Sequence, residues 1–337
     1  MRIEKTMSEK SINHIVYITD ENYVLPTLVS LNSLVANTPP HVHIQVHVIA
    51  VEVSERSRKK FSEIHSGSVS VQAHDFKDEY ADFGIEHFYV SKSALFKFRL
   101  PEIFHDLDRI LYIDGDIILN KGFEKIFEHD ISSCYAAVVQ DMFISTHTNW
   151  AEKLGHEKYF NSGMLYLNIA RMRQDSCTQK LIEYKKNETD HSFMDQNALN
   201  VVLGDNVLYL DCRFNFLAVY LVDYTYEQIS SFYGLDDESR EECEKSPYFL
   251  HFAGANKVWN DFRVLLWENW AEHCNESVVF PLMKNYCMTL AGELERQNAE
   301  LERQNDRLDK LFGRIEYVSH RTLYGACAWL WHKILGR

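Results

Sequence analysis

Two kinds of segment alternate in the pattern of hydrophobic and polar positions along the first third of the chain. Apolar, β-branched runs predict buried strands at 12–19, 43–51, 69–73 and 109–113. The segments between them predict helices at 25–35 and 55–65, the second one capped by Ser54. Strands that alternate with helices form βαβ units, so we expect an α/β fold with a mixed, mainly parallel sheet flanked by helices.

The same mixed pattern continues to about residue 280. A helix is expected at 92–104, interrupted by Pro101. Further apolar runs predict strands at 163–167 and 207–210. The acidic stretch 236–245 is expected to be a solvated loop or the solvent face of a helix.

The last fifty residues follow a heptad pattern. One core position holds Leu294, Leu301, Leu308 and Ile315, and the complementary position holds Ala291, Asn298, Asn305 and Phe312. Paired core asparagines favour a parallel dimeric coiled coil through residues 291–315. Three heptads are marginal, so an isolated amphipathic helix packed on the domain is the alternative. We therefore expect a main domain over residues 1–285 and a helical extension over 286–337.

Aromatic and cationic residues are mixed within residues 314–337. Such a mixture suits contact with a membrane surface, and packing against the body of the protein is the alternative. No apolar run reaches the length that spans a bilayer, and the N-terminus lacks the apolar stretch of a signal peptide. We expect a cytoplasmic protein, with a peripheral position on the inner face of the membrane as a further option.

The composition is that of a globular protein, with 46% hydrophobic and 25% charged residues among 337. The 35 basic residues face 49 acidic ones, a formal net charge of −14. This balance argues against nucleic acid as a partner, so an anionic ligand must be held locally by a metal, a few cations or backbone amides. The seven cysteines are widely spaced without a CxxC motif, which predicts reduced thiols.

Two carboxylates, Asp114 and Asp116, flank Gly115 directly after the apolar run 109–113. Ligands of open α/β sheets bind at the carboxyl ends of strands. Residues i and i+2 of an extended backbone point to the same side, so both carboxylates can reach one divalent cation, Mn²⁺ or Mg²⁺. Gly115 is expected to relax the backbone and to leave room for a bulky ligand.

Five motifs occur in order around this pair: ALFKFRLPEIF, ILYIDGD, YFNSGMLYLN, FMDQNALN and HFAGANKVW. Together they resemble glycosyltransferase family 8, whose members are retaining and use nucleotide sugars; the family includes lipopolysaccharide galactosyl- and glucosyltransferases. The resemblance covers residues 12 to about 260 and implies a GT-A-like fold. It also implies that Asp114, Asp116 and His251 bind Mn²⁺.

The resemblance assigns the UDP-sugar contacts as well. Gly254 and Lys257 match the residues that hold the diphosphate, although Val258 replaces the usual proline before Trp259. The turn after the first strand would cradle uracil and ribose through Asp20, Asn22 and Tyr23, an ordinary capped turn being the alternative. Lys97 stands where the family commonly has arginine against the donor, and Arg99 is the alternative cation.

The remaining motifs match the family's sugar-binding and catalytic edge. The resemblance implies that Asn161 and Asp195 contact the donor sugar and that Gln196 lies near the anomeric carbon. An amide is a poor nucleophile, so a double displacement with two carboxylates is not visible. Asp141 has the spacing of an acceptor-side acid, whereas the segment 213–215 (RFN) is expected to be structural.

These expectations point to a metal-dependent retaining hexosyltransferase. The donor would be UDP-galactose or UDP-glucose, and the acceptor a lipopolysaccharide core, another glycolipid or a glycoprotein. The alternative from another class is a non-catalytic protein that binds nucleotide sugars and acts through its coiled coil. A nucleotidyltransferase or phosphohydrolase is a third hypothesis, but the stretch TDENYVLP lacks the Gly-rich, Lys-containing loop of the former.

Overall fold

The structure is a computed structural model that describes residues 12–77, 92–188, 193, 195–261, 263–274, 288 and 292–310. The chain divides into two compact units, Met1–Glu276 and Ser277–Arg337. The boundary expected after residue 285 falls in a stretch outside the described residues and stays a prediction.

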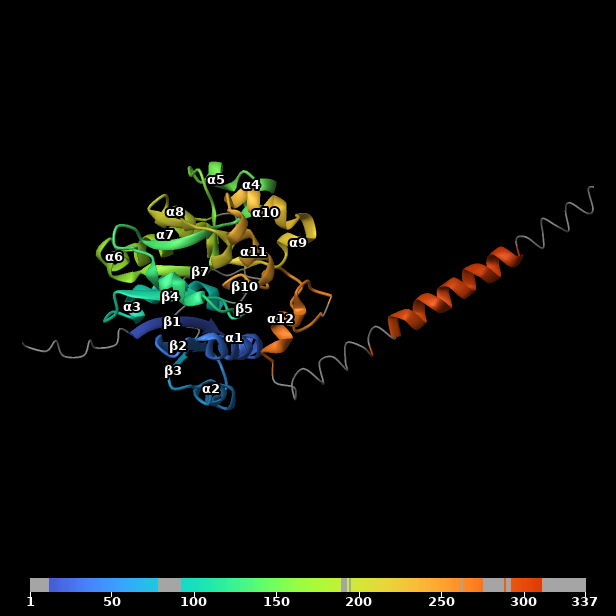
Figure 1. Cartoon of the computed structure of the whole chain (residues 1–337), viewed down its shortest axis with the longest axis horizontal. Helices are drawn as coiled ribbons and strands as arrows, with labels where there is room; N and C mark the ends of the chain where they lie inside the picture. Colours follow the sequence, from blue (N-terminus) through green and yellow to red (C-terminus); the bar gives the residue numbers. More distant parts are fainter. Residues whose placement is uncertain are drawn as a thin grey trace, which may run out of the picture. The chain divides into compact units, whose positions relative to one another are not determined.

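A seven-stranded sheet forms the centre of the first unit (Figure 1). Its order is β3-β2-β1-β4-β7-β6-β8, and β7 runs antiparallel to both of its neighbours while the other pairs are parallel. This confirms the mixed, mainly parallel sheet. The strands are β1 (Ile12–Thr19), β2 (His43–Val51), β3 (Val69–Phe76), β4 (Arg109–Ile113), β6 (Ala136–Gln140), β7 (Phe160–Asn168) and β8 (Val207–Leu210).

Alternate residues of the central strands enter two separate cores. Ile15 and Tyr17 of β1 pack on the side of helices α1 (Val24–Asn37) and α2 (Glu55–Ser62). Val16 and Ile18 pack on the opposite side, which is covered by a 3₁₀ helix, η3, and four α-helices. Because both faces are covered, these strands are apolar at nearly every position, as parallel strands are. The second cover consists of η3 (Lys92–Arg99), α3 (Leu100–Ile103), α6 (Ile169–Gln174), α7 (Cys177–Asn187) and α8 (Gln196–Leu203).

A small second sheet, which the sequence pattern did not predict, lies beyond the end of β4. It contains β5 (Ile117–Leu119), β10 (Phe249–His251) and β9 (Phe216–Leu217), with β10 in the middle. β10 is antiparallel to β5, and its register pairs His251 with Ile117. That register brings His251 next to the turn that carries Asp114 and Asp116.

The remaining short helices connect these elements. Asp236, for example, accepts the Ser239 backbone N–H and so caps α11, which settles the acidic stretch 236–245 as a helix. The others are η1 (Glu21–Tyr23), η4 (Phe123–Glu128), α4 (Met142–His147), α5 (Trp150–Lys153), η5 (Cys212–Phe214), α9 (Tyr220–Asp223), α10 (Tyr226–Tyr233), α11 (Asp237–Lys245) and α12 (Trp267–Glu272).

The single helix expected at 92–104 is wrong in type and in the role of its proline. Residues Lys92–Arg99 form a 3₁₀ helix, and Pro101 lies in the first turn of the short α3 that follows. Proline is tolerated there because its missing N–H would have no partner within the helix anyway. Pro101 therefore starts a helix and does not interrupt one.

The second unit contains a helix over residues 292–310. This confirms helical structure for the middle of the heptad pattern. Ala291, Phe312 and Ile315 lie outside the described residues, and so does the aromatic and cationic segment 314–337. Within the part of the chain that the structure describes, none of the helices has both the length and the apolar character needed to cross a bilayer.

Candidate active site

A cavity of about 290 Å³ opens at the carboxyl ends of β1 and β4. These two strands are the switch point of the sheet, where the chain order reverses and ligands of such folds bind. The residues predicted to contact the donor or the metal all line it except Asn22, which is exposed, whereas Asp141, the predicted acceptor-side acid, does not line it. The lining set is Asp20, Tyr23, Lys97, Asp114, Gly115, Asp116, Asn161, Asp195, Gln196, His251, Gly254 and Lys257.

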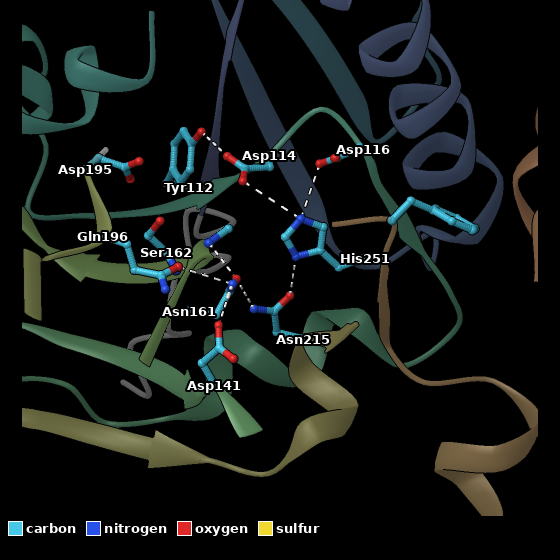
Figure 2. Close-up of polar contacts among 12 residues, drawn as sticks. Tyr112, Asp114, Asp116, Asp141, Asn161, Ser162, Asp195, Gln196, Asn215 and His251 are labelled. Atoms are coloured by element: carbon cyan, nitrogen blue, oxygen red, sulfur yellow. Dashed lines mark hydrogen bonds and ion pairs between the residues drawn. The ribbon is translucent and has the colours of Figure 1, made fainter. Parts of the chain in front are cut away.

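Asp114, Asp116 and His251 form a cluster that could hold a metal ion. One ligand atom from each lies within 4.8 Å of the others. His251 Nε2 is 3.3 Å from Asp116 Oδ1 and 3.9 Å from Asp114 Oδ2 (Figure 2). Two carboxylates and one imidazole are a donor set that suits Mn²⁺. We call these three residues the Asp–Asp–His cluster.

The two carboxylates converge through a turn, which corrects the extended backbone assumed from the sequence. Ile117 N donates to Asp114 O at 3.3 Å, closing the turn between β4 and β5. Gly115 does not make room for a ligand, because a Cβ there would lie 2.4 Å from Thr27 Oγ1 of α1. The glycine therefore allows the turn to pack against α1.

Gly163 supplies the space at the cluster instead. A Cβ on Gly163 of β7 would lie 2.3 Å from His251 Cε1 and 3.0 Å from Asp114 Oδ2. Contacts this short would force the side chain of His251 or Asp114 to move, and both residues belong to the Asp–Asp–His cluster. The sequence pattern predicted a strand at Gly163 but no role for this residue, since its importance arises only when β7 pairs with β4.

A chain of amides fixes the orientation of the His251 ring. The Gly163 N–H donates to Asn161 Oδ1 at 3.0 Å, and Asn215 Nδ2 donates to the same oxygen at 2.9 Å. Asn215 Oδ1 then faces His251 Nδ1 at 3.0 Å. Because a carbonyl oxygen only accepts, this contact needs the proton on Nδ1 and leaves the Nε2 lone pair for the carboxylate side.

The amide chain continues away from the cluster. Asn161 Nδ2 donates to Gln196 Oε1 at 3.2 Å and to Asp141 Oδ2 at 3.3 Å. Gln196 Oε1 also accepts the Ser162 N–H at 3.0 Å, which settles the orientation of the Gln196 amide. We call Asp141, Asn161, Gln196 and Asn215 the amide network; all four are buried.

Burial raises the pKa of Asp141, although hydrogen bonds from the Ile144 N–H and Asn161 oppose it. Asp141 also caps α4 by accepting that Ile144 N–H at 3.1 Å. It is not among the residues that line the cavity. Its position supports Asn161 and does not favour the acceptor-side role predicted from spacing.

Two lysines, the buried Lys97 and the partly buried Lys257, neutralise the carboxylates. Lys97 Nζ lies 2.8 Å from Asp195 Oδ2 and 3.2 Å from Asp114 Oδ1. Lys257 Nζ donates to Asp116 Oδ2 at 2.6 Å. Burial alone would lower the pKa of each lysine, but the carboxylates outweigh it and raise both. Both ammonium groups are therefore charged at neutral pH.

Asp116 shows the same balance from the carboxylate side. Burial would raise its pKa, but Lys257 and His251 hold the pKa of this carboxyl well below its usual range. Arg99, the alternative to Lys97, does not line the cavity and pairs with Glu102 at 3.5 Å. Lys97 is thus the cation of this segment that faces the site.

The turn after β1 forms one end of the cavity. Asp20 Oδ1 accepts the backbone N–H groups of Asn22 and Tyr23, at 2.9 and 3.2 Å. Tyr23 meets Trp259 edge to face, with ring centroids 5.4 Å apart. Gly254, at the neighbouring loop, has φ of +105°, a conformation that side chains other than glycine rarely adopt.

Besides Gly163, three lining or supporting residues were missed or misjudged from the sequence. Tyr112 donates to Asp114 Oδ1, and burial together with the charge of Asp114 raises its pKa, so the hydroxyl keeps its proton. Ser162 contributes only backbone groups, to Gln196 and to Lys97. Asn215 was expected to be structural, and its side chain instead orients His251, while its neighbour Arg213 pairs with Asp211 and Glu242.

Comparison with known proteins agrees with this geometry. Residues 14–263 match the family described as glycosyl transferase family 8. General stress protein A of Bacillus subtilis is 25% identical over 260 residues, covering 75% of this chain and 90% of that protein. The lipopolysaccharide 1,2-glucosyltransferase of Escherichia coli K12 is 22% identical over 272 residues, covering 74% of each.

Solved structures show the same fold. The galactosyltransferase LgtC, crystallised with donor and acceptor sugar analogs, superposes with a TM-score of 0.62 at 22% identity. The match covers 77% of this chain and 94% of LgtC. It supports a GT-A-type architecture, as the mixed sheet indicates. With a family match over most of its length, the chain belongs to glycosyltransferase family 8.

Proposed function

We propose that this glycosyltransferase moves a hexose, galactose or glucose, from a UDP-sugar to a cell-surface glycan with retention of configuration and with the help of Mn²⁺. The Asp–Asp–His cluster, which lies beside Lys257 in the wall of the switch-point cavity, carries the proposal. Asp114, Asp116 and His251 would hold the ion. The bound ion would supply a Lewis acid that stabilises the negative charge of the leaving diphosphate.

Different residues of the chain would contact the base, the diphosphate and the sugar of the donor. Tyr23 offers a ring for the base, and Lys257 offers a charged ammonium for the diphosphate. Gly254 allows the backbone to approach that diphosphate closely. Lys97 holds Asp195 at the cavity wall, where the carboxylate can accept hydrogen bonds from sugar hydroxyls.

Gln196 would lie near the sugar of the donor, but its side-chain amide is a poor nucleophile. Its carbonyl oxygen already accepts two hydrogen bonds, from Asn161 and from the Ser162 N–H. We therefore favour attack by the acceptor hydroxyl on the same face as the leaving UDP. The acceptor oxygen bonds to the anomeric carbon, the bond to the phosphate oxygen breaks, and the hydroxyl proton passes to a phosphate oxygen of UDP. The protein aligns the two substrates.

The acceptor follows by analogy from the relatives. The relatives include lipopolysaccharide transferases, among them the glucosyltransferase above and the 1,3-galactosyltransferase of Salmonella typhimurium, 25% identical over 179 residues. We propose a lipopolysaccharide core or another lipid-linked or protein-linked surface glycan for this chain. Peripheral attachment at the inner face of the membrane belongs to the same proposal.

The proposal is tested by UDP release from a panel of UDP-sugars, with and without Mn²⁺. We expect slow hydrolysis of one sugar that requires Mn²⁺, and a loss of roughly 1,000-fold in Asp116→Ala because one ligand and the partner of Lys257 disappear. The matched control is Asp237→Ala, an exposed aspartate in the first turn of α11.

Two other outcomes would count against the proposal. Mn²⁺-dependent UDP binding without turnover of any sugar, also after acceptor glycans are supplied, would favour a non-catalytic nucleotide-sugar binder. Turnover that is indifferent to Mn²⁺ and to Asp116→Ala would remove the metal from the mechanism.

A further inference from the structure

The helix at residues 292–310 carries a row of leucines that its own side chains do not cover. Leu294, Leu301 and Leu308 are 61%, 56% and 50% exposed. Nearly all the other residues of this helix are polar or charged, apart from Gly292 and Ala299. Large apolar side chains repeated at a fixed spacing need a partner surface to leave water.

The width of the leucine row on the helix indicates what kind of surface can cover it. The leucines recur every seven residues and form a narrow seam. A helix that packs on a globular domain presents an apolar stripe about 100° wide or more, whereas a strict heptad seam is the mark of a coiled coil. The pattern therefore favours another helix of the same kind.

The asparagines define the orientation of that partner. With leucine at position d of the heptad, Asn298 and Asn305 occupy position a. In a parallel, in-register pair each asparagine faces its own copy, and the two amides can hydrogen-bond. In an antiparallel pair position a faces position d, so each amide would be buried against leucine without a partner.

The flanking charges agree with the asparagines. Position e holds Glu295, Glu302 and Asp309, and position g holds Gln297 and Gln304. In a parallel pair g faces e of the partner, which brings glutamine amides to carboxylates. In an antiparallel pair e faces e, which brings carboxylates together and repels. The cations Arg296, Arg303 and Lys310 occupy the outward position f, and Arg303 pairs with Glu300 of its own helix at 3.3 Å.

We propose that residues 292–310 pair with the same segment of a second copy as a parallel, in-register, two-stranded coiled coil. Leucine at d with asparagine at a specifies two strands over three or four. The parallel arrangement brings the carboxyl ends of both helices to the same end of the coiled coil. It also joins two donor sites in one particle, and it does not depend on which sugar those sites use.

The stoichiometry is tested with the full chain by sedimentation equilibrium over a range of concentrations. The short seam predicts a reversible dimer of twice 39.6 kDa, with dissociation at about micromolar concentration. Leu301→Glu should weaken association at least about 100-fold, since it places a charge in the seam. Arg296→Glu introduces the same residue at position f and should leave the dimer within about threefold of wild type.

Orientation is tested by oxidising Asn298→Cys with glutathione disulfide. Two thiols lose their hydrogens to form the cross-link, and the oxidant is reduced to glutathione. Rapid formation of a covalent dimer is expected only for a parallel, in-register pair. Arg296→Cys is the matched control at an outward position, and wild type controls for the native cysteines.

Three outcomes would overturn the proposal. They are a monomer at every concentration, a trimer or larger assembly, and a dimer in which Asn298→Cys cross-links no faster than Arg296→Cys. An unchanged thermal unfolding transition in Leu301→Glu would show that the loss of the dimer is not a loss of the fold.

Discussion

The candidate site has two sides that are built from different chemistry. The Asp–Asp–His cluster and its lysines hold five ionisable side chains in close contact. The amide network on the other side is linked through Asn161, takes further hydrogen bonds from backbone N–H groups, and holds a single carboxylate. A ligand can rearrange the ion pairs of the first side, whereas the hydrogen bonds of the second side hold the His251 ring in one orientation.

Two aspartates show what the difference means. The pKa of Asp116 lies below its usual range because Lys257 and His251 outweigh its burial. The pKa of Asp141 is raised because burial outweighs both the hydrogen bonds and the charge of His251 that oppose it. The same residue type is thus tuned toward ion binding on one side and toward structural support on the other.

Within this comparison of the two sides, the largest effect on Mn²⁺ affinity is expected from closing the space at Gly163. Gly163→Ala places a methyl group against His251 and Asp114, so Mn²⁺ affinity should fall about 100-fold or more. Gly67→Ala is the matched control, since a Cβ there meets nothing within 4 Å. Calorimetric titration with Mn²⁺ measures both. Equal affinity in the two variants would mean that His251 is not a ligand.

Asn215 contacts both sides of the site, so two different substitutions can distinguish its contact with His251 from its contact with Asn161. Asn215→Ala removes the acceptor of the His251 Nδ1 proton, and Mn²⁺ affinity should fall about 10-fold. Asn215→Asp keeps that acceptor but loses the donor to Asn161, so its Mn²⁺ affinity should stay within a few-fold of wild type. Equal losses in the two variants would sink the idea that Asn215 works through the tautomer of His251.

The smallest effect concerns stability. A carboxyl whose pKa is raised in the folded state binds its proton more tightly there, so its contribution to stability falls as pH rises through the folded pKa. The unfolding free energy of wild type minus that of Asp141→Asn should therefore decrease from about pH 4 upward. Each tenfold change in proton affinity is worth about 1.4 kcal/mol.

Urea unfolding at several pH values measures this difference. Asp130 is the matched control, because a hydrogen bond from the Ser132 N–H lowers its pKa. For Asp130→Asn the difference should run in the opposite sense and appear only in acid. A flat profile for Asp141→Asn would contradict the burial of an ionised carboxylate in the amide network.

Several strands were predictable to the residue. The runs 12–19, 43–51 and 109–113 became β1, β2 and β4 with the expected bounds, whereas 69–73 and 163–167 are parts of the longer strands β3 and β7. The strands β5, β9 and β10 have only two or three residues each, too few to show a period. Their pairing depends on contacts between distant segments.

The site residues likewise fall into those with a local sequence signal and those without one. Asp114 and Asp116 carry a local signal, since they flank a single glycine directly after a strand. Asn215 carries none: its partners Asn161 and His251 lie 54 and 36 residues away, and only the folded chain brings them together. The family's motif pattern located His251, whereas the group that orients it required the structure.

The pairing of β10 with β5 also sets the order of events during synthesis. Asp116 emerges from the ribosome well before Lys257, from which it is separated by 141 residues. Until β10 has been made and has paired, the two aspartates lack their imidazole and ammonium neighbours, and such long-range contacts form late in folding. Ion binding at this turn would therefore report that the first unit is complete. A chain truncated before β10 would contain both aspartates but neither His251 nor Lys257, and we expect it to have no affinity for the donor.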